Sequence, residues 1–145
     1  MRKGLLSILM AGVGMLMASC ELEMSDNGKL DGFWQLRSVD TLANGASADV
    51  RSMYVTWSFQ GRLMQVRHVT SVLGVFFDFN HQGDSLYISN PYLSDREVDD
   101  VKVTDPGLLQ GYGIQKLEEG YRVLQLDNNT MKLESDLVRL TFKKY

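Results

Sequence analysis

The chain has 145 residues, of which 44% are hydrophobic and 23% charged, so it is long enough for one globular domain and too short for two. Its formal net charge of -3 argues against nucleic-acid binding, because such interfaces need a basic face. It has one cysteine, Cys20, which excludes an internal disulfide framework.

Residues 1–19 have the layout of a secretory signal peptide. Arg2 and Lys3 are positively charged, residues 5–17 are mostly apolar, and Ala18 and Ser19 are small. The apolar run is too short for a membrane-spanning helix, which needs about 20 residues. We therefore predict a cleaved signal peptide over residues 1–19.

The stretch Leu16-Met17-Ala18-Ser19-Cys20 resembles a bacterial lipobox. The resemblance implies that the thiol of Cys20 carries a diacyl group and that its amine, freed by cleavage, is acylated too. Each buried methylene contributes about 0.8 kcal/mol, and stable anchoring needs more than one chain. The membrane is thus an expected partner through the lipid on Cys20. The alternative is an ordinary signal peptide with a cysteine there by chance.

Residues 20–29 are polar and acidic and show no periodicity, which predicts a flexible tether after the acylated cysteine. Acidic residues at this place resemble the export signals of some surface-exposed Gram-negative lipoproteins. We expect an outer-membrane lipoprotein, at the cell surface or on the periplasmic face.

From Leu30 onward the hydrophobic period is two, which is typical of half-buried strands. A first strand is predicted from Gly32, with Trp34 and Leu36 on one face, followed by a loop over residues 40–52. Alternation then predicts strands at 53–59, 62–69, 75–79 and 85–89, with turns at 60–61 and 81–84.

Residues 90–119 contain both prolines and three glycines, and the pattern is irregular. A structureless connection of this length is unusual in a compact domain. We therefore expect a short strand at 101–103, a turn at 105–107, and either a helical turn or a strand within 108–117.

Three further strands are predicted at 121–126, 131–134 and 138–143, with a turn at 127–129. About eight short strands joined mostly by tight turns predict an all-β domain over residues 30–145. The expected architecture is an antiparallel up-and-down meander closed into a barrel, since closure removes the exposed edges.

Gly32-Phe33-Trp34 at the start of this meander resembles the opening of the lipocalin and wider calycin group. Met131-Lys132-Leu133 and the terminal stretch 140–145 are similar to small lipocalin-like lipoprotein domains of Gram-negative envelopes. The resemblance implies an up-and-down barrel, often with a pocket for a small apolar ligand.

In lipocalins a basic side chain packs over the tryptophan of the first strand. An antiparallel pairing places the end of the last strand beside the start of the first. Lys144 has the parity of Leu140 and Phe142, so we expect it over Trp34, with Arg139 as the alternative. A cation over an indole ring contributes about 0.5–2 kcal/mol.

Three residues are candidates for ligand or partner contacts. His68 has the apolar parity of its strand, and it could contact a ligand inside the barrel or be hydrogen-bonded near the strand end. Tyr92 and Tyr112 lie in the irregular connection and could edge a pocket, form a partner surface or anchor a loop. The aromatic residues of core parity either fill the interior or line a small cavity.

Catalytic, metal and cofactor sites are not predicted. His68 and His81 have no metal-ligand spacing around them, Asp99-Asp100 is expected to be a solvated loop, and neither a nucleophile elbow nor a phosphate-binding loop is present. We therefore expect a non-enzymatic, lipid-anchored envelope protein. Two hypotheses follow: the barrel binds a small apolar or amphipathic ligand, or the domain is a structural or accessory module that contacts an envelope protein partner.

Overall fold

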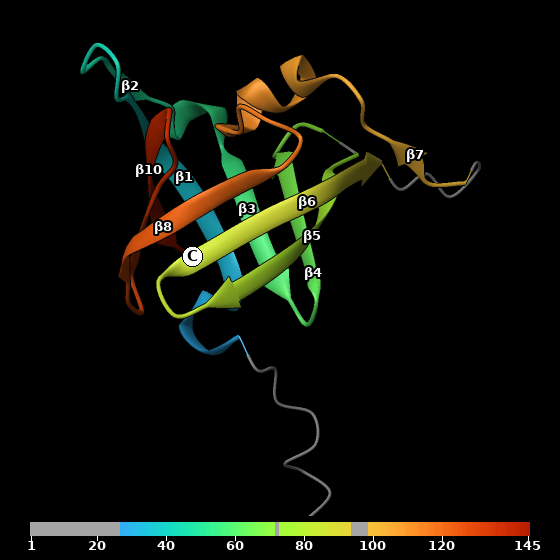
Figure 1. The fold of residues 1–145 in the computed structure, drawn as a ribbon, viewed down its shortest axis with the longest axis horizontal. Helices are drawn as coiled ribbons and strands as arrows, with labels where there is room; N and C mark the ends of the chain where they lie inside the picture. Colours follow the sequence, from blue (N-terminus) through green and yellow to red (C-terminus); the bar gives the residue numbers. More distant parts are fainter. Residues whose placement is uncertain (1–26, 72, 94–98) are drawn as a thin grey trace, which may run out of the picture.

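The computed structural model describes residues 27–71, 73–93 and 99–145, so the predicted signal peptide, Cys20 and residues 21–26 lie outside the described part. In that part, eight antiparallel strands form a closed barrel in the order β1-β3-β4-β5-β6-β8-β9-β10, and β10 pairs back with β1 (Figure 1). The strands are β1 (Gly32–Thr41), β3 (Val55–Gln60), β4 (Leu63–His68), β5 (Val75–Gln82), β6 (Ser85–Leu93), β8 (Glu119–Leu126), β9 (Thr130–Glu134) and β10 (Val138–Lys144). The predicted all-β barrel is confirmed.

Period-two alternation sets which side chains enter the barrel. In β3, Val55, Trp57 and Phe59 are buried, while the side chains between them are partly exposed. In β10, Val138, Leu140 and Phe142 are buried in the same way. A shift of one residue in either strand would turn its apolar set toward solvent, so the pattern fixes the register.

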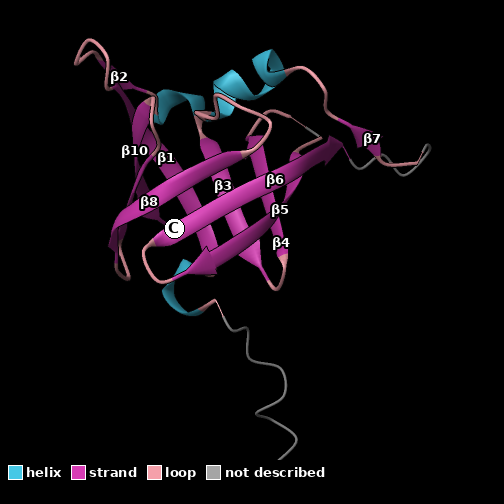
Figure 2. Cartoon of the chain, in the orientation of Figure 1, coloured by secondary structure: helices cyan, strands magenta, loops and turns pink. Residues whose placement is uncertain are grey.

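Short 3-10 helices lie at the two ends of the barrel (Figure 2). Helix η2 (Gly28–Leu30) precedes β1 at the end that we call the base. Helices η3 (Arg51–Met53) and η4 (Pro106–Tyr112) lie at the opposite end, the mouth. Two short strands, β2 (Ser47–Asp49) and β7 (Val101–Lys102), extend beyond the barrel wall.

The predicted loop over 40–52 and the predicted strand start at Met53 are both wrong. β1 continues to Thr41, and β2 pairs with it in the middle of the expected loop. Tyr54 has a left-handed backbone with φ +50° at the end of η3, which ends that helix before β3 begins. Met53 is therefore exposed and does not extend the buried face of β3.

The irregular region also begins later than predicted. β6 continues through Pro91 to Leu93, because Asn90 takes a left-handed backbone with φ +53° at a bulge between the pairs Phe76–Tyr92 and Asp78–Ser89. The bulge absorbs the extra residue and lets the strand resume. The expected short strand near 101–103 is present as β7, and the segment after Asp105 is the 3-10 helix η4.

The barrel interior is filled by large side chains. Trp57 lies at its centre, with ring centroids 4.8 Å from Phe142 and 5.9 Å from Tyr121. Phe59 contacts the half-buried Phe79 edge to face at 5.2 Å. Of the two interpretations left open by the sequence, the filled interior is the one that the described residues show.

Candidate functional site

The base of the barrel is closed by Trp34, which is fully buried and pairs with Lys144 across the β1–β10 seam. Its indole N–H donates to the carbonyl of Leu30 at 2.8 Å. Lys144 Nζ lies 5.1 Å from the centre of the Trp34 ring, whereas Arg139 pairs with Asp40 nearer the mouth. The side chain beside the tryptophan is thus Lys144 and not Arg139.

Gly32 gives this base its close packing. It has φ +113°, which side-chain-bearing residues rarely adopt, and a Cβ there would lie 3.1 Å from Lys144 Cε. The Gly-x-Trp stretch is therefore a structural unit: the glycine leaves room for the lysine that packs on the tryptophan.

The mouth is plugged by η4 and the residues that follow it. Asp105 caps the helix by accepting a hydrogen bond from the Gly107 N–H at 2.9 Å, and Leu109 and Ile114 are fully buried. The Trp57 indole N–H donates to the Tyr112 carbonyl at 3.0 Å, which joins the plug to the centre of the interior.

Two of the three predicted contact residues meet at this plug. The His68 and Tyr112 rings lie 4.8 Å apart at an angle of 39°, and burial raises the pKa of Tyr112. His68 Nε2 would lie 3.3 Å from a Cβ on Gly111, so the imidazole packs directly beneath η4. Both residues hold the plug against the barrel, whereas Tyr92 lies elsewhere, on the outer wall.

Tyr92 belongs to an aromatic surface on the outer wall. Phe76 and Tyr92 are opposite each other in β5 and β6, and their rings stack at 5.7 Å with 22° between planes. One cross-strand row runs Phe33, Ser58, Gln65, Phe76, Tyr92, and Tyr145 N donates to the Phe33 carbonyl at 3.1 Å. We call Phe33, Phe76, Tyr92 and Tyr145 the aromatic face.

Two hollows open on this face. One, of about 530 Å³, has Phe33, Phe59, Leu63 and Phe76 in its lining, together with polar residues of β3 and β4. The other, of about 280 Å³, lies beside it and includes Tyr145, and both share Phe33, Ser58 and Gln65. Phe33 is 60% exposed and Tyr145 70% exposed, so two of the aromatic rings at these hollows are in contact with solvent.

A third hollow, of about 720 Å³, forms a notch in the opposite part of the wall. Strand β8 pairs with β9 only from Arg122, so residues 119–121 have β6 partners and lack β9 partners. The notch lies beside this unpaired stretch, between β8 and the turn from β9 to β10. Its lining includes Leu42, Asp84, Tyr121, Arg122, Glu134 and Asp136.

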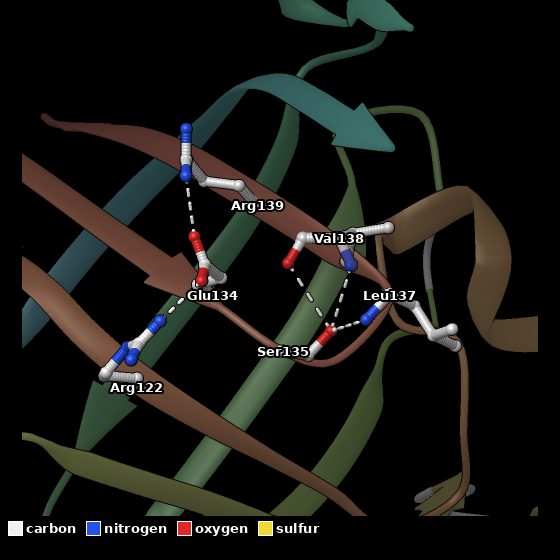
Figure 3. Close-up of polar contacts among 6 residues, drawn as sticks. All are labelled: Arg122, Glu134, Ser135, Leu137, Val138 and Arg139. Carbon is white, nitrogen blue, oxygen red and sulfur yellow. Dashed lines mark hydrogen bonds and ion pairs between the residues drawn. The ribbon is translucent and has the colours of Figure 1, made fainter. Parts of the chain in front are cut away.

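Glu134 organises the charged wall of the notch (Figure 3). Its carboxylate accepts hydrogen bonds from Arg122 at 2.6 Å and from Arg139 at 2.8 Å. These bonds, from Arg139 first and then Arg122, lower the pKa of Glu134. The neighbouring Ser135 Oγ accepts from the Leu137 and Val138 N–H groups at 3.2 Å, which fixes the turn.

Two polar groups of β8 are buried without partners. Glu119 is 5% exposed and Tyr121 2% exposed, and both face the interior. Among the described residues, Glu119 Oε2 and the Tyr121 hydroxyl find no hydrogen-bond partner. Burial raises the pKa of Glu119; the charge of Lys116 opposes this shift, and the charge of Asp136 adds to it. Burial, and after it the charge of Glu119, raises the pKa of Tyr121.

In the described ranges, three or more His, Cys, Asp or Glu side chains are nowhere grouped so that they could hold a metal ion. In the same ranges, no helix is both long enough and apolar enough to cross a membrane.

Sequence reasoning missed the notch and most of the aromatic face, although a signal for each was present. The strand predicted from Tyr121 starts two residues earlier, and Glu119 shares the inward parity of Tyr121. A carboxylate at an inward position is unusual, because the interior of the barrel is mostly apolar, and it could have indicated a site here. Phe33 and Phe76 are large aromatic residues at outward positions, which marks an exposed surface.

Comparison with known proteins agrees with the closed eight-stranded barrel. The lipocalin-like domain family matches residues 15–145, so the chain belongs to that family, which is generally non-enzymatic. A crystal structure of a lipocalin-like protein from Bacteroides uniformis ATCC 8492 is similar with a TM-score of 0.62 and 23% identity, covering 81% of this chain and 100% of that one. An uncharacterized protein from Bacteroides eggerthii DSM 20697 has a TM-score of 0.61 and 21% identity, covering 80% and 99%. No curated protein matches the chain.

Proposed function

We propose that this chain is a lipid-anchored envelope protein that acts as a non-catalytic interaction module and docks a protein partner on its aromatic face. The observation that carries the proposal is the pairing of a filled interior with exposed aromatic rings around two adjacent hollows. Aromatic residues are enriched at protein interfaces, and exposed apolar patches on soluble domains mark interaction sites.

The shape of the aromatic face favours a protein over a small molecule. The row from Phe33 to Tyr92 crosses four neighbouring strands, β1, β3, β4 and β5, and reaches a fifth, β6. Its centre is polar, at Ser58 and Gln65, and its ends are aromatic. An elongated surface with separate apolar anchor points suits a partner that inserts several side chains, since a few buried aromatic anchors carry most of the energy of an interface.

A lipid anchor on Cys20 would hold the barrel by its base and leave the aromatic face free. The lipobox-like stretch before Cys20 supports acylation there, and the described chain enters the barrel at the base through η2. Asn27 Nδ2 donates to the Gly61 carbonyl and to Asp31 Oδ1, both at 2.7 Å, and so fixes the point of entry. The aromatic face lies on the barrel wall, so an anchor at the base does not cover it.

The experiment compares affinity isolation of the full-length lipoprotein from envelopes for the wild type, F33S/F76S and the control L124S. Leu124 is 42% exposed and belongs to β8, outside the aromatic face. One defined protein should co-isolate stoichiometrically with wild type and L124S and be lost with F33S/F76S, while all three fractionate and melt alike. Equal recovery with all three, or recovery of lipid alone, contradicts the proposal.

A further inference from the structure

We infer that the notch between β8 and the β9–β10 turn binds a small primary amine with an apolar body, with the ammonium group held by Glu119 and Tyr121. This site is separate from the aromatic face, so it is independent of the function proposed above.

Two polar atoms of β8 are buried without partners among the described residues. Glu119 Oε2 and the Tyr121 hydroxyl are buried on the same face of β8, two residues apart, and lack hydrogen-bond partners among the described residues. Buried polar groups in proteins are nearly always hydrogen-bonded, and each exception needs an explanation. A carboxylate oxygen needs a donor, which the neighbouring phenol does not supply in this arrangement.

A ligand can reach this part of β8 through the notch. Because residues 119–121 of β8 have no β9 partners, the wall is open beside them, and the notch of about 720 Å³ lies there. Tyr121 and Asp136 both line this notch, and the charge of Asp136 raises the pKa of Glu119. The volume falls within the range of about 300–1,000 Å³ that is usual for small-molecule pockets.

The charge of the notch selects the class of ligand. The notch is lined by Asp84, Glu134 and Asp136. Glu119 precedes Gly120 of the lining and is close enough to Asp136 for the charge of that residue to raise its pKa. Arg122 is the basic residue of the lining, and it is already engaged by Glu134. A carboxylate or phosphate ligand would be repelled, whereas an ammonium group supplies three donors and a compensating charge. The apolar body would lie against Leu42 at the rim.

The experiment titrates the full chain with three probes of equal length, n-hexylamine, n-hexanol and hexanoate, by calorimetry at constant ionic strength. Hexylamine should bind saturably, hexanol at least about tenfold more weakly, and hexanoate not at all. E119Q should weaken hexylamine binding by about tenfold or more, and Y121F by less, since the carboxylate carries the charge.

The matched control is E118Q, which makes the same change one residue away. Glu118 is exposed and accepts a hydrogen bond from the Tyr87 hydroxyl at 2.9 Å on the outer side of the barrel. E118Q should leave hexylamine binding unchanged. The inference is overturned if hexylamine does not bind, if E118Q and E119Q weaken it equally, or if Glu119 and Tyr121 are satisfied by an ordered water that persists in the presence of the amine.

Discussion

Lys144 Nζ lies 5.1 Å from the centre of the Trp34 ring, and the two residues are direct partners across the seam that closes the barrel. Lys144 Nζ also donates to the Lys29 carbonyl at 3.4 Å, so one side chain joins the last strand, the first strand and η2. The base of the barrel is therefore held by a contact between the beginning and the end of the domain.

Replacing Lys144 with methionine should test this contact, because the apolar stem remains while the charge is lost. We expect K144M to lower the free energy of unfolding by about 0.5–1 kcal/mol, the usual contribution of an exposed cation over an indole ring. K143M is the control, since the neighbouring Lys143 is exposed and pairs with Gln35. Urea unfolding should separate the two variants, and equal losses would argue against a specific contact.

Gly32 should be intolerant of a side chain for two reasons that a control can separate. Gly32 and Gly45 both have positive φ, at +113° and +69°, but only a Cβ on Gly32 meets a neighbour within 4 Å. G45A should cost about 1 kcal/mol, from the backbone alone. G32A should cost more, about 1–3 kcal/mol, and should disturb the tryptophan fluorescence of the base. A smaller loss for G32A would contradict the packing described here.

The bond from Trp57 to the plug should control the stability of the mouth. W57F removes the donor to the Tyr112 carbonyl and should lower the free energy of unfolding by about 1 kcal/mol. Amide exchange should accelerate in η4 and at Ile114 while the base is unchanged. W34F gives the reverse control, because it removes the bond to Leu30 at the base. Uniform acceleration with W57F would show that the plug is not a separate unit.

Glu119 should make stability depend on pH in a definite direction. Its folded-state pKa is raised by burial, so its contribution is fully present below the ordinary pKa of 4.5 and is lost as the pH rises through the raised value. The glutamine in E119Q does not titrate. The melting temperature of E119Q should therefore rise relative to that of the wild type as the pH goes from acidic to neutral. E118Q should parallel the wild type. An E119Q advantage that is independent of pH would contradict the assignment to the carboxylate charge.

The anchor at Cys20 can be tested apart from the fold. C20S should move the protein from the membrane fraction to the soluble fraction and abolish labelling with a palmitate analogue, because no acyl chain is then attached. The melting temperature of the barrel should not change, since Cys20 precedes the described residues. A variant that stays in the membrane fraction with unchanged migration would disprove lipidation at this residue.

The barrel was predictable because each wall strand is half buried, so alternation in the sequence reports the fold directly. Trp57 and Phe59 show this in β3. The structure differs from the predicted strands where the backbone angle of a single residue decides whether a helix ends or a strand continues. Tyr54 and Asn90 take left-handed conformations that allow η3 to end and β6 to pass a bulge. Asparagine adopts this conformation more readily than most residues, but tyrosine does not.

The candidate sites were harder to predict because they depend on strand register. Phe76 and Tyr92 are far apart in the sequence and meet only because β5 and β6 pair with that particular offset. Glu119 and Asp136 come close where β9 ends opposite Arg122, so that the first three residues of β8 have no β9 partner and the notch is left open. Composition and periodicity do not contain these offsets.

The most direct test of the proposed function is photo-crosslinking of the full-length lipoprotein in the envelope, with a photoreactive phenylalanine at Phe76 and, as control, at Leu124. Phe76 lies between Gln65 and Tyr92 in the row across the aromatic face, and Leu124 lies on β8 outside it. We expect one discrete protein adduct from position 76 that is absent from position 124 and is lost in the F33S background. Adducts of equal pattern from both positions, or none from position 76, would contradict it.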